Sequence, residues 1–238
     1  MSGKVNWENL TEIILCNNIS IMLEFKVADY TVQIKPTQSE DGRACVKESW
    51  LRGGELDRED GPALIIKDIE KNETIETGYY QKGLLHRVGK RAEHAFTDNT
   101  ETIIYAEHGK AHRVDGPAII DINRKTNLVI GTAWVRNDKS HREDGPSTLH
   151  RDPDSGIAVV TIFERHGLMH RTDGPAYIER DKETGIITVE DYHIDGNLHR
   201  DNGPASIERD RETGAINRAD FYRNGVLFDP NSPNIQPQ

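Results

Sequence analysis

A 29-residue internal repeat constrains the fold of this chain more than any other feature of its sequence. Five histidines that precede an arginine are separated once by 26 residues and then three times by 29; they are His86, His112, His141, His170 and His199. Three of them open the pattern His-Arg-x-Asp-Gly-Pro, and the segment that begins at Asp57 is a close variant. Periods of about 20 to 50 residues are typical of arrays in which each unit packs against its neighbours.

Other positions keep the same period. A glycine stands three residues before each of these points, except at Asp138, and Ala-x-Ile or a near variant follows each Gly-Pro. A polar turn then ends in asparagine or glycine, residues that tolerate positive φ; these are Asn72, Asn127, Gly156, Gly185 and Gly214. Seven residues before each point stands an aromatic residue, in the series Trp50, Tyr79, Tyr105, Trp134, Phe163, Tyr192 and Phe221.

The composition of each period favours β-structure. The segment from Ile186 to Tyr192 is rich in β-branched residues, and Asp195-Gly196 is a strong signal for a two-residue hairpin turn. Proline lacks the N–H that a strand ladder needs, so Gly-Pro predicts a kink in the hairpin. We therefore predict an all-β fold: an elongated, twisted antiparallel sheet of about six 29-residue β-hairpin repeats with an N-terminal β cap.

A turn at Asp195-Gly196 fixes the expected role of the histidine. It places Ile194 opposite Asn197, His193 opposite Leu198 and Tyr192 opposite His199. Directly opposed residues share a face of the sheet. We therefore expect the repeated histidine to pack against the repeated aromatic ring, while the arginine and aspartate brace the turn.

Two recurring histidines are expected to lie too far apart to share a function. Equivalent atoms in successive two-stranded units are about 9–10 Å apart, at about 4.7–4.9 Å per strand. A zinc ion needs each ligand nitrogen within about 2.0–2.1 Å, and general acid–base chemistry needs partners within about 2.6–3.2 Å. The spacing thus favours a structural role, and we predict no metal site, no cofactor and no catalytic residue.

The stretch from Phe163 to His170, like that from Tyr192 to His199, has an aromatic residue, then glycine four positions on, then histidine. This pattern resembles the MORN repeat. It is still more similar to the "HRxDGPA" β-hairpin repeat of bacterial, phage and giant-virus proteins, over about residues 50–229. The longer period and the Arg-x-Asp-Gly-Pro segment distinguish the chain from MORN proteins. The resemblance implies a single-sheet scaffold, spacer or protein- or lipid-contacting surface, and no catalytic residue carries over.

The charge and cysteine content bound the functions that remain. A formal net charge of −10 and a pI near 5.5 argue against generic binding of nucleic acid. The two cysteines, Cys16 and Cys45, are too few for a disulfide framework, so we expect a reducing compartment such as the cytoplasm, or the host cytoplasm for a viral protein. Polar residues interrupt the apolar run from Ile13 to Phe25, so it predicts neither a signal peptide nor a membrane span.

The period divides the chain into three expected parts: an N-terminal β cap or small domain at 1–49, the repeat domain at 50–229 and a flexible, proline-rich tail at 230–238. Within the first part, we expect strands at Thr11 to Leu15, Ile19 to Val27 and Tyr30 to Lys35.

The second repeat is irregular, because it lacks Asp-Gly-Pro and gathers positive charge in an acidic chain. It reads His86-Arg-Val-Gly-Lys-Arg-Ala-Glu-His94. The candidate residues for contact with an acidic partner are Arg87, Lys90, Arg91 and His94; the alternative is a repeat that has decayed into a solvated loop.

We therefore expect a non-catalytic protein that binds another protein or acts as a scaffold, for example a viral inhibitor of a host enzyme or defence complex. The oligomeric state stays open. Two alternatives also remain: a membrane-surface scaffold of the MORN type, disfavoured by the acidity, and a small-molecule binder or enzyme with a site between the cap and the first repeats.

Overall fold

The computed structural model describes residues 22–39 and 41–231, and every regular element in this part is a β-strand with antiparallel neighbours. This confirms the predicted all-β, antiparallel fold. The chain divides into two compact units between His112 and Arg113, and each unit is described here by itself. The predicted strand from Thr11 to Leu15, Cys16 and most of the predicted tail lie outside the described residues.

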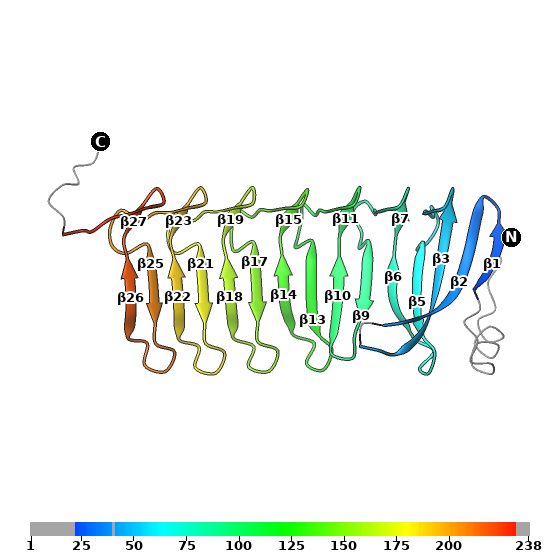
Figure 1. The fold of residues 1–238 in the computed structure, drawn as a ribbon, viewed down its shortest axis with the longest axis horizontal. Helices are drawn as coiled ribbons and strands as arrows, with labels where there is room; N and C mark the ends of the chain where they lie inside the picture. Colours follow the sequence, from blue (N-terminus) through cyan, green and yellow to red (C-terminus); the bar gives the residue numbers. More distant parts are fainter. Residues whose placement is uncertain (1–21, 40, 232–238) are drawn as a thin grey trace. The chain divides into compact units, whose positions relative to one another are not determined.

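Unit 1 is built on an open sheet with the strand order β1-β2-β3-β5-β6-β9-β10 (Figure 1). The short strand β4 pairs with the end of β3, and the pairs β7–β8 and β11–β12 form two-stranded hairpins. The strands are β1 (Leu23–Val27), β2 (Tyr30–Gln38), β3 (Ala44–Arg52), β4 (Glu55–Leu56), β5 (Leu64–Asp68), β6 (Thr74–Gly78), β7 (Tyr80–Gln81), β8 (Leu84–Leu85), β9 (Glu93–Phe96), β10 (Thr100–Ile104), β11 (Ala106–Glu107) and β12 (Lys110–Ala111).

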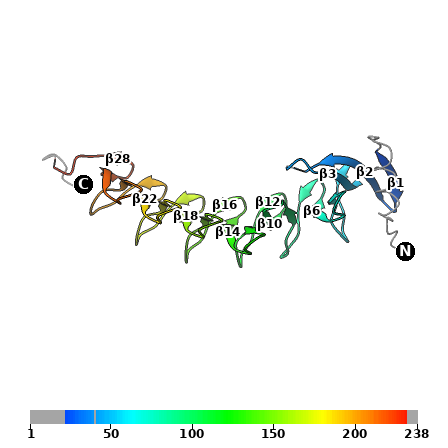
Figure 2. The ribbon, with the colours of Figure 1, turned by 90° about the horizontal axis from the view of Figure 1, so that it is seen from below.

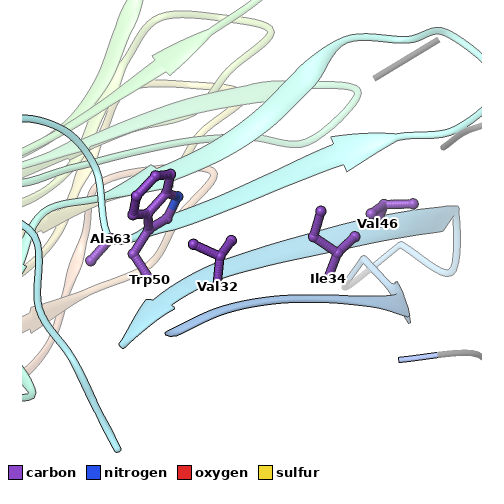
Figure 3. Packing of buried hydrophobic residues seen from close by; sticks show 5 residues of the cluster. All are labelled: Val32, Ile34, Val46, Trp50 and Ala63. Atoms are coloured by element: carbon purple, nitrogen blue, oxygen red, sulfur yellow. The ribbon is translucent and has the colours of Figure 1, made fainter. Parts of the chain in front are cut away.

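The hydrophobic core of unit 1 lies where β2 and β3 pair. Val32 and Ile34 alternate along β2 and are fully buried, and Val32 is directly opposite Trp50 of β3. Figure 3 shows these side chains together with Val46 and Ala63. Burying a side chain of this size contributes about 1.5–3 kcal/mol. The predicted boundary at 49/50 falls inside β3, so the sheet continues without interruption from the predicted cap into the first repeat.

Unit 2 repeats one arrangement several times. Its main sheet has the order β13-β14-β17-β18-β21-β22-β25-β26, and a short hairpin accompanies each pair of long strands (Figures 1 and 2). The long strands are β13 (Ile119–Asn123), β14 (Val129–Ala133), β17 (Thr148–Arg151), β18 (Ala158–Ile162), β21 (Tyr177–Arg180), β22 (Ile187–Asp191), β25 (Ser206–Arg209) and β26 (Ile216–Asp220). The short hairpins are β15 (Val135–Arg136) with β16 (Lys139–Ser140), β19 (Glu164–Arg165) with β20 (Leu168–Met169), β23 (His193–Ile194) with β24 (Asn197–Leu198) and β27 (Tyr222–Arg223) with β28 (Val226–Leu227).

Each repeat contains the kinked hairpin that the sequence predicts. Ile194 pairs with Asn197 and His193 pairs with Leu198, which confirms the expected register around Asp195-Gly196. Both turn residues have positive φ, 50° and 83°. The glycine-free turn at Asn137-Asp138 also has positive φ at both positions.

The kink is a loop, and the backbone of the aromatic residue before the hairpin holds both ends of it. The N–H of His199 donates to the carbonyl of Tyr192 at 2.9 Å, and the N–H of Tyr192 donates to the carbonyl of Ala205 at 2.7 Å. The ladder resumes where Asp191 pairs with Ser206. We call the segment from the histidine position to the alanine position a motif loop; the motif loops are residues 57–63, 86–92, 112–118, 141–147, 170–176 and 199–205.

In unit 2 the short hairpins lie at one end of the long strands and the polar turns at the other (Figure 1). Each polar turn is closed by an aspartate or an asparagine: Oδ1 of Asp181 accepts hydrogen bonds from the N–H groups of Glu183 and Thr184, and Oδ1 of Asn123 accepts them from Lys125 and Thr126. The last residue of the turn has positive φ, as predicted, with 74° at Gly185 and 58° at Asn127. The two ends of unit 2 thus carry different chemistry.

Candidate functional site

The guanidinium group of the arginine in each motif loop lies within that loop and bonds to its backbone. The guanidinium carbon of Arg171 lies 3.9 Å from the centre of the Phe163 ring. One terminal nitrogen donates to the carbonyl of Pro175 at 3.3 Å, and Nε donates to Asp173 at 2.7 Å. The same stacking on the preceding aromatic ring is made by Arg58, Arg87, Arg142 and Arg200, at 3.6 to 4.1 Å.

Gly-Pro-Ala completes the loop for steric reasons. A Cβ atom at Gly174 would lie 3.0 Å from the guanidinium carbon of Arg171, so the arginine needs a residue without a side chain there. The alanine that ends the loop has no exposed surface in five repeats, and Ser147 is equally buried in the sixth. Arginine, aspartate, glycine and alanine are therefore explained by closure of the loop.

The histidine binds the hairpin of the next repeat. Nδ1 of His141 accepts a hydrogen bond from the backbone N–H of His166 at 3.2 Å. The same contact joins His86 to His108, His170 to Asp195 and His199 to Asn224, at 2.9 to 3.2 Å. We expected the imidazole to pack against the aromatic ring. In these repeats the guanidinium stacks on that ring, and the imidazole nitrogen bonds to the following hairpin, a contact that the sequence did not predict.

A second bond couples each motif loop to the following hairpin. The backbone N–H of Arg171 donates to the carbonyl of His193 at 3.1 Å, and that of Arg200 donates to Tyr222 at 3.2 Å. The backbone N–H of His112 donates to the carbonyl of Tyr105 at 3.0 Å, as at the other histidines. Successive repeats within a unit are thus held together by the motif loops as well as by strand pairing.

The environment of the imidazole differs between repeats. His141 is buried, and its ring centre lies 4.4 Å from that of His166; burial, and then the charge of His166, lowers the pKa of His141. His170 instead has its Nδ1 2.8 Å from a carboxylate oxygen of Asp195. No group of three or more histidine, cysteine or acidic side chains in the described ranges is arranged to hold a metal ion.

The four candidate residues of the second repeat do not form one surface. Arg87 is inside its motif loop, with its guanidinium 3.7 Å from the Tyr79 ring and 3.2 Å from the carbonyl of Arg91. His94 lies on β9, where Nε2 is 2.6 Å from Glu101. Lys90 and Arg91 are exposed at the loop.

Sequence reasoning missed two exposed apolar side chains of the second repeat. Val88 is 68% exposed and Leu84 is 49% exposed. Val88, Lys90 and Tyr79 line a surface depression of about 430 Å³, whose other wall is Glu59 and Asp60 of the preceding motif loop. The signal in the sequence was the valine at the third position of the loop, which loop 112–118 shares and where loops 57–63 and 141–147 carry glutamate.

A second hollow in unit 1 corresponds to the expected location of a site between the cap and the first repeats. Its volume is about 270 Å³. Ile66, Glu76, Ala95 and Thr102 are paired in one cross-strand row and line it, and the β2–β3 connection forms a wall. Burial raises the pKa of Glu93, which also lines the hollow.

Within residues 22–39 and 41–231, no helix has the length and hydropathy that a membrane span requires. Comparison with models of known protein families and with curated protein sequences gives no match to this chain.

Proposed function

We propose that this chain is a non-catalytic protein that acts by binding another protein. One observation carries the proposal: the recurring polar side chains of the motif are engaged in holding the repeat together, while the residues that differ between repeats are exposed. The third position of the motif loop is the clearest example, occupied by Glu59, Val88, Glu143, Thr172 or Asp201, or by Val114. A constant frame with a variable surface is how repeat proteins make specific contacts.

An inhibitor of a host enzyme or defence complex is one concrete form of this function, favoured by the resemblance to phage and giant-virus repeats. The acidic character of the chain is compatible with a partner that has a basic surface. A membrane-surface scaffold is the alternative that the resemblance to MORN repeats suggests. The acidity of the chain disfavours it, because anionic lipids attract clusters of lysine and arginine.

Affinity purification of the tagged full chain from its native cells, with chemical cross-linking, tests the proposal. We expect a partner protein in stoichiometric amount, cross-linked to exposed residues of the motif loops or hairpins. Sedimentation with vesicles that contain phosphatidylserine, and no such protein, would instead support the membrane scaffold. An enzymatic activity lost when the five motif histidines are replaced by glutamine, in a chain that still folds, would refute a non-catalytic function.

Binding of a small organic cation is a second candidate, favoured by the hollow that Glu76 and Glu93 line. Its volume fits a small ligand, and among the described residues that line it the one basic side chain, Arg43, is already paired with Asp41 at 2.9 Å and Asp68 at 3.2 Å. Titration with phenethylamine and with the uncharged phenethyl alcohol, followed by NMR, tests it. Saturable shifts for the amine alone, lost in Glu93→Gln, would support a site, and equal or absent shifts would exclude it.

A further inference from the structure

We propose that the second motif loop, Arg87 to Arg91, is the docking site for a short acidic peptide segment of a partner protein. This inference rests on the proposed function and names the contact surface and the chemistry of the partner.

The second loop keeps the closure of the others although it has lost Asp-Gly-Pro. Arg87 still stacks on its aromatic ring, still donates to the carbonyl four residues on, and Ala92 is still fully buried. Gly89 has a φ of 63° and accommodates the altered path. Closure of the loop therefore does not account for Lys90 and Arg91, which replace the glycine and proline of the regular loops.

The substitutions reverse the charge of the loop. In the regular loops, aspartate or glutamate balances or outnumbers the arginine: Arg58 donates to Asp60 at 3.1 Å and Arg142 to Asp144 at 2.8 Å. The second loop has three cations and no anion between Arg87 and Arg91, in a chain of net charge −10. The structure gives Lys90 and Arg91 no ion pair with any described residue. Such an isolated basic spot attracts and orients an acidic partner.

The surroundings of the loop favour a peptide over a polyanion. Val88 is exposed and lines the same depression as Lys90, and a peptide can cover it with an aliphatic or aromatic side chain. Glu59 and Asp60 line the same depression, so the negative charge of a ligand has to stay near Lys90 and Arg91; a short acidic segment can meet this condition and a continuous row of phosphates cannot. The segment that fits has a few acidic residues next to an apolar one.

A variant that restores the regular loop separates docking from folding. The substitutions Gly89→Asp, Lys90→Gly and Arg91→Pro give the second repeat the sequence of its neighbours and should leave its fold intact. A second variant, Lys90→Gln with Arg91→Gln, removes the two exposed charges and keeps the backbone. The control, Lys125→Glu with Lys182→Ser, changes net charge as much as the first variant, at exposed turns of unit 2.

The probe is a random-sequence peptide library displayed on phage and selected on the full chain. We expect enrichment of peptides that combine aspartate or glutamate with leucine, isoleucine or phenylalanine. Their affinity, measured by fluorescence polarisation, should fall by about 2- to 30-fold in both loop variants, since each exposed charge pair contributes about 0.2–1 kcal/mol and both variants remove two exposed cations. It should change by less than about twofold in the control and should weaken with added salt.

Acidic peptides that bind both loop variants as tightly as the unaltered chain would overturn the inference and leave the proposed function intact. Loop-dependent binding of phosphatidylserine vesicles or of a polyuridylate oligonucleotide, without peptide binding, would overturn it in favour of that ligand. A full chain that enriches no peptide also overturns this inference. If it captures no cross-linked partner from its native cells either, the proposed function fails as well.

Discussion

Replacement of Arg171 by methionine tests the account of the motif loop most directly. Methionine keeps an unbranched apolar stem but removes the guanidinium that lies 3.9 Å from the Phe163 ring and 3.3 Å from the carbonyl of Pro175. The stacking is worth about 0.5–1 kcal/mol at a partly exposed site, and the hydrogen bond about 0.5–1.5 kcal/mol. The ion pair with Asp173 is open to solvent, and we assign it no stabilisation.

The sum is about 2 kcal/mol, which corresponds to about a 30-fold increase in local opening. Amide hydrogen exchange reads it out at two positions that close the loop, the N–H groups of Phe163 and His170. Both should exchange about 30 times faster in Arg171→Met, and the urea midpoint of the chain should fall.

Two further variants make the reasoning refutable. Arg200 makes the same ring and carbonyl contacts, at 3.8 Å and 3.1 Å, but Asn202 stands where the other loops, except 86–92, have aspartate. Arg200→Met should therefore cost about as much as Arg171→Met. Arg171→Lys should recover little, because an ammonium group cannot stack flat and bridge two acceptors. Full stability in Arg171→Lys, or unchanged exchange in Arg171→Met, would show that the guanidinium does not hold the loop.

Three other outcomes follow from single contacts. The pKa of His141 is lowered below its ordinary 6.5, so the unfolded chain binds the proton more readily than the folded chain. The stabilisation that neutral His141 contributes to the folded chain is therefore complete above pH 6.5 and is lost as the pH falls through the lowered pKa. Urea midpoints of the chain and of His141→Gln across this range measure it, and identical pH profiles would contradict it. Ser147→Ala should lower the free energy of unfolding by only about 1 kcal/mol or less, because alanine fills this site in the other repeats. Ala176→Leu should lower it by about 1–3 kcal/mol, because leucine overpacks a site with no exposed surface. Equal thermal melting of the two variants would be incompatible with that difference. Asp181→Ala should speed exchange of the Thr184 amide without affecting Phe163, and protection unchanged at Thr184 would show that the carboxylate is not needed for the turn.

The strands, their register and the positive-φ turns were predictable because they depend on local chemistry. Alternation of β-branched residues sets the faces of a strand, and Asp195-Gly196 sets the turn that aligns its two arms. The partner of His170 was not predictable in this way. The imidazole bonds to the N–H of Asp195, 25 residues away in the following repeat, and strand pairing within one hairpin says nothing about that contact.

The candidate residues of the second repeat show the same limit. Charge and the lost Asp-Gly-Pro segment drew attention to Arg87 and His94. Arg87 is nevertheless held against Tyr79, and His94 bonds Glu101 on the neighbouring strand. The repeat period shows where one repeat differs from its neighbours in sequence. Only the three-dimensional structure shows that Arg87 closes its motif loop while Lys90 and Arg91 are exposed to solvent.

Phe228 stands where the next histidine of the series would be, and this has a consequence for how such a chain is extended. Its N–H donates to the carbonyl of Phe221 at 2.9 Å, as the histidines do with their aromatic residues, but its ring lies against Phe221 at 6.0 Å and has no nitrogen to offer a following hairpin. Grafting one more module after this point would therefore require both a new 29-residue segment and Phe228→His. The replacement of histidine by phenylalanine thus removes the one acceptor atom through which the other motif loops hold the hairpin that follows them.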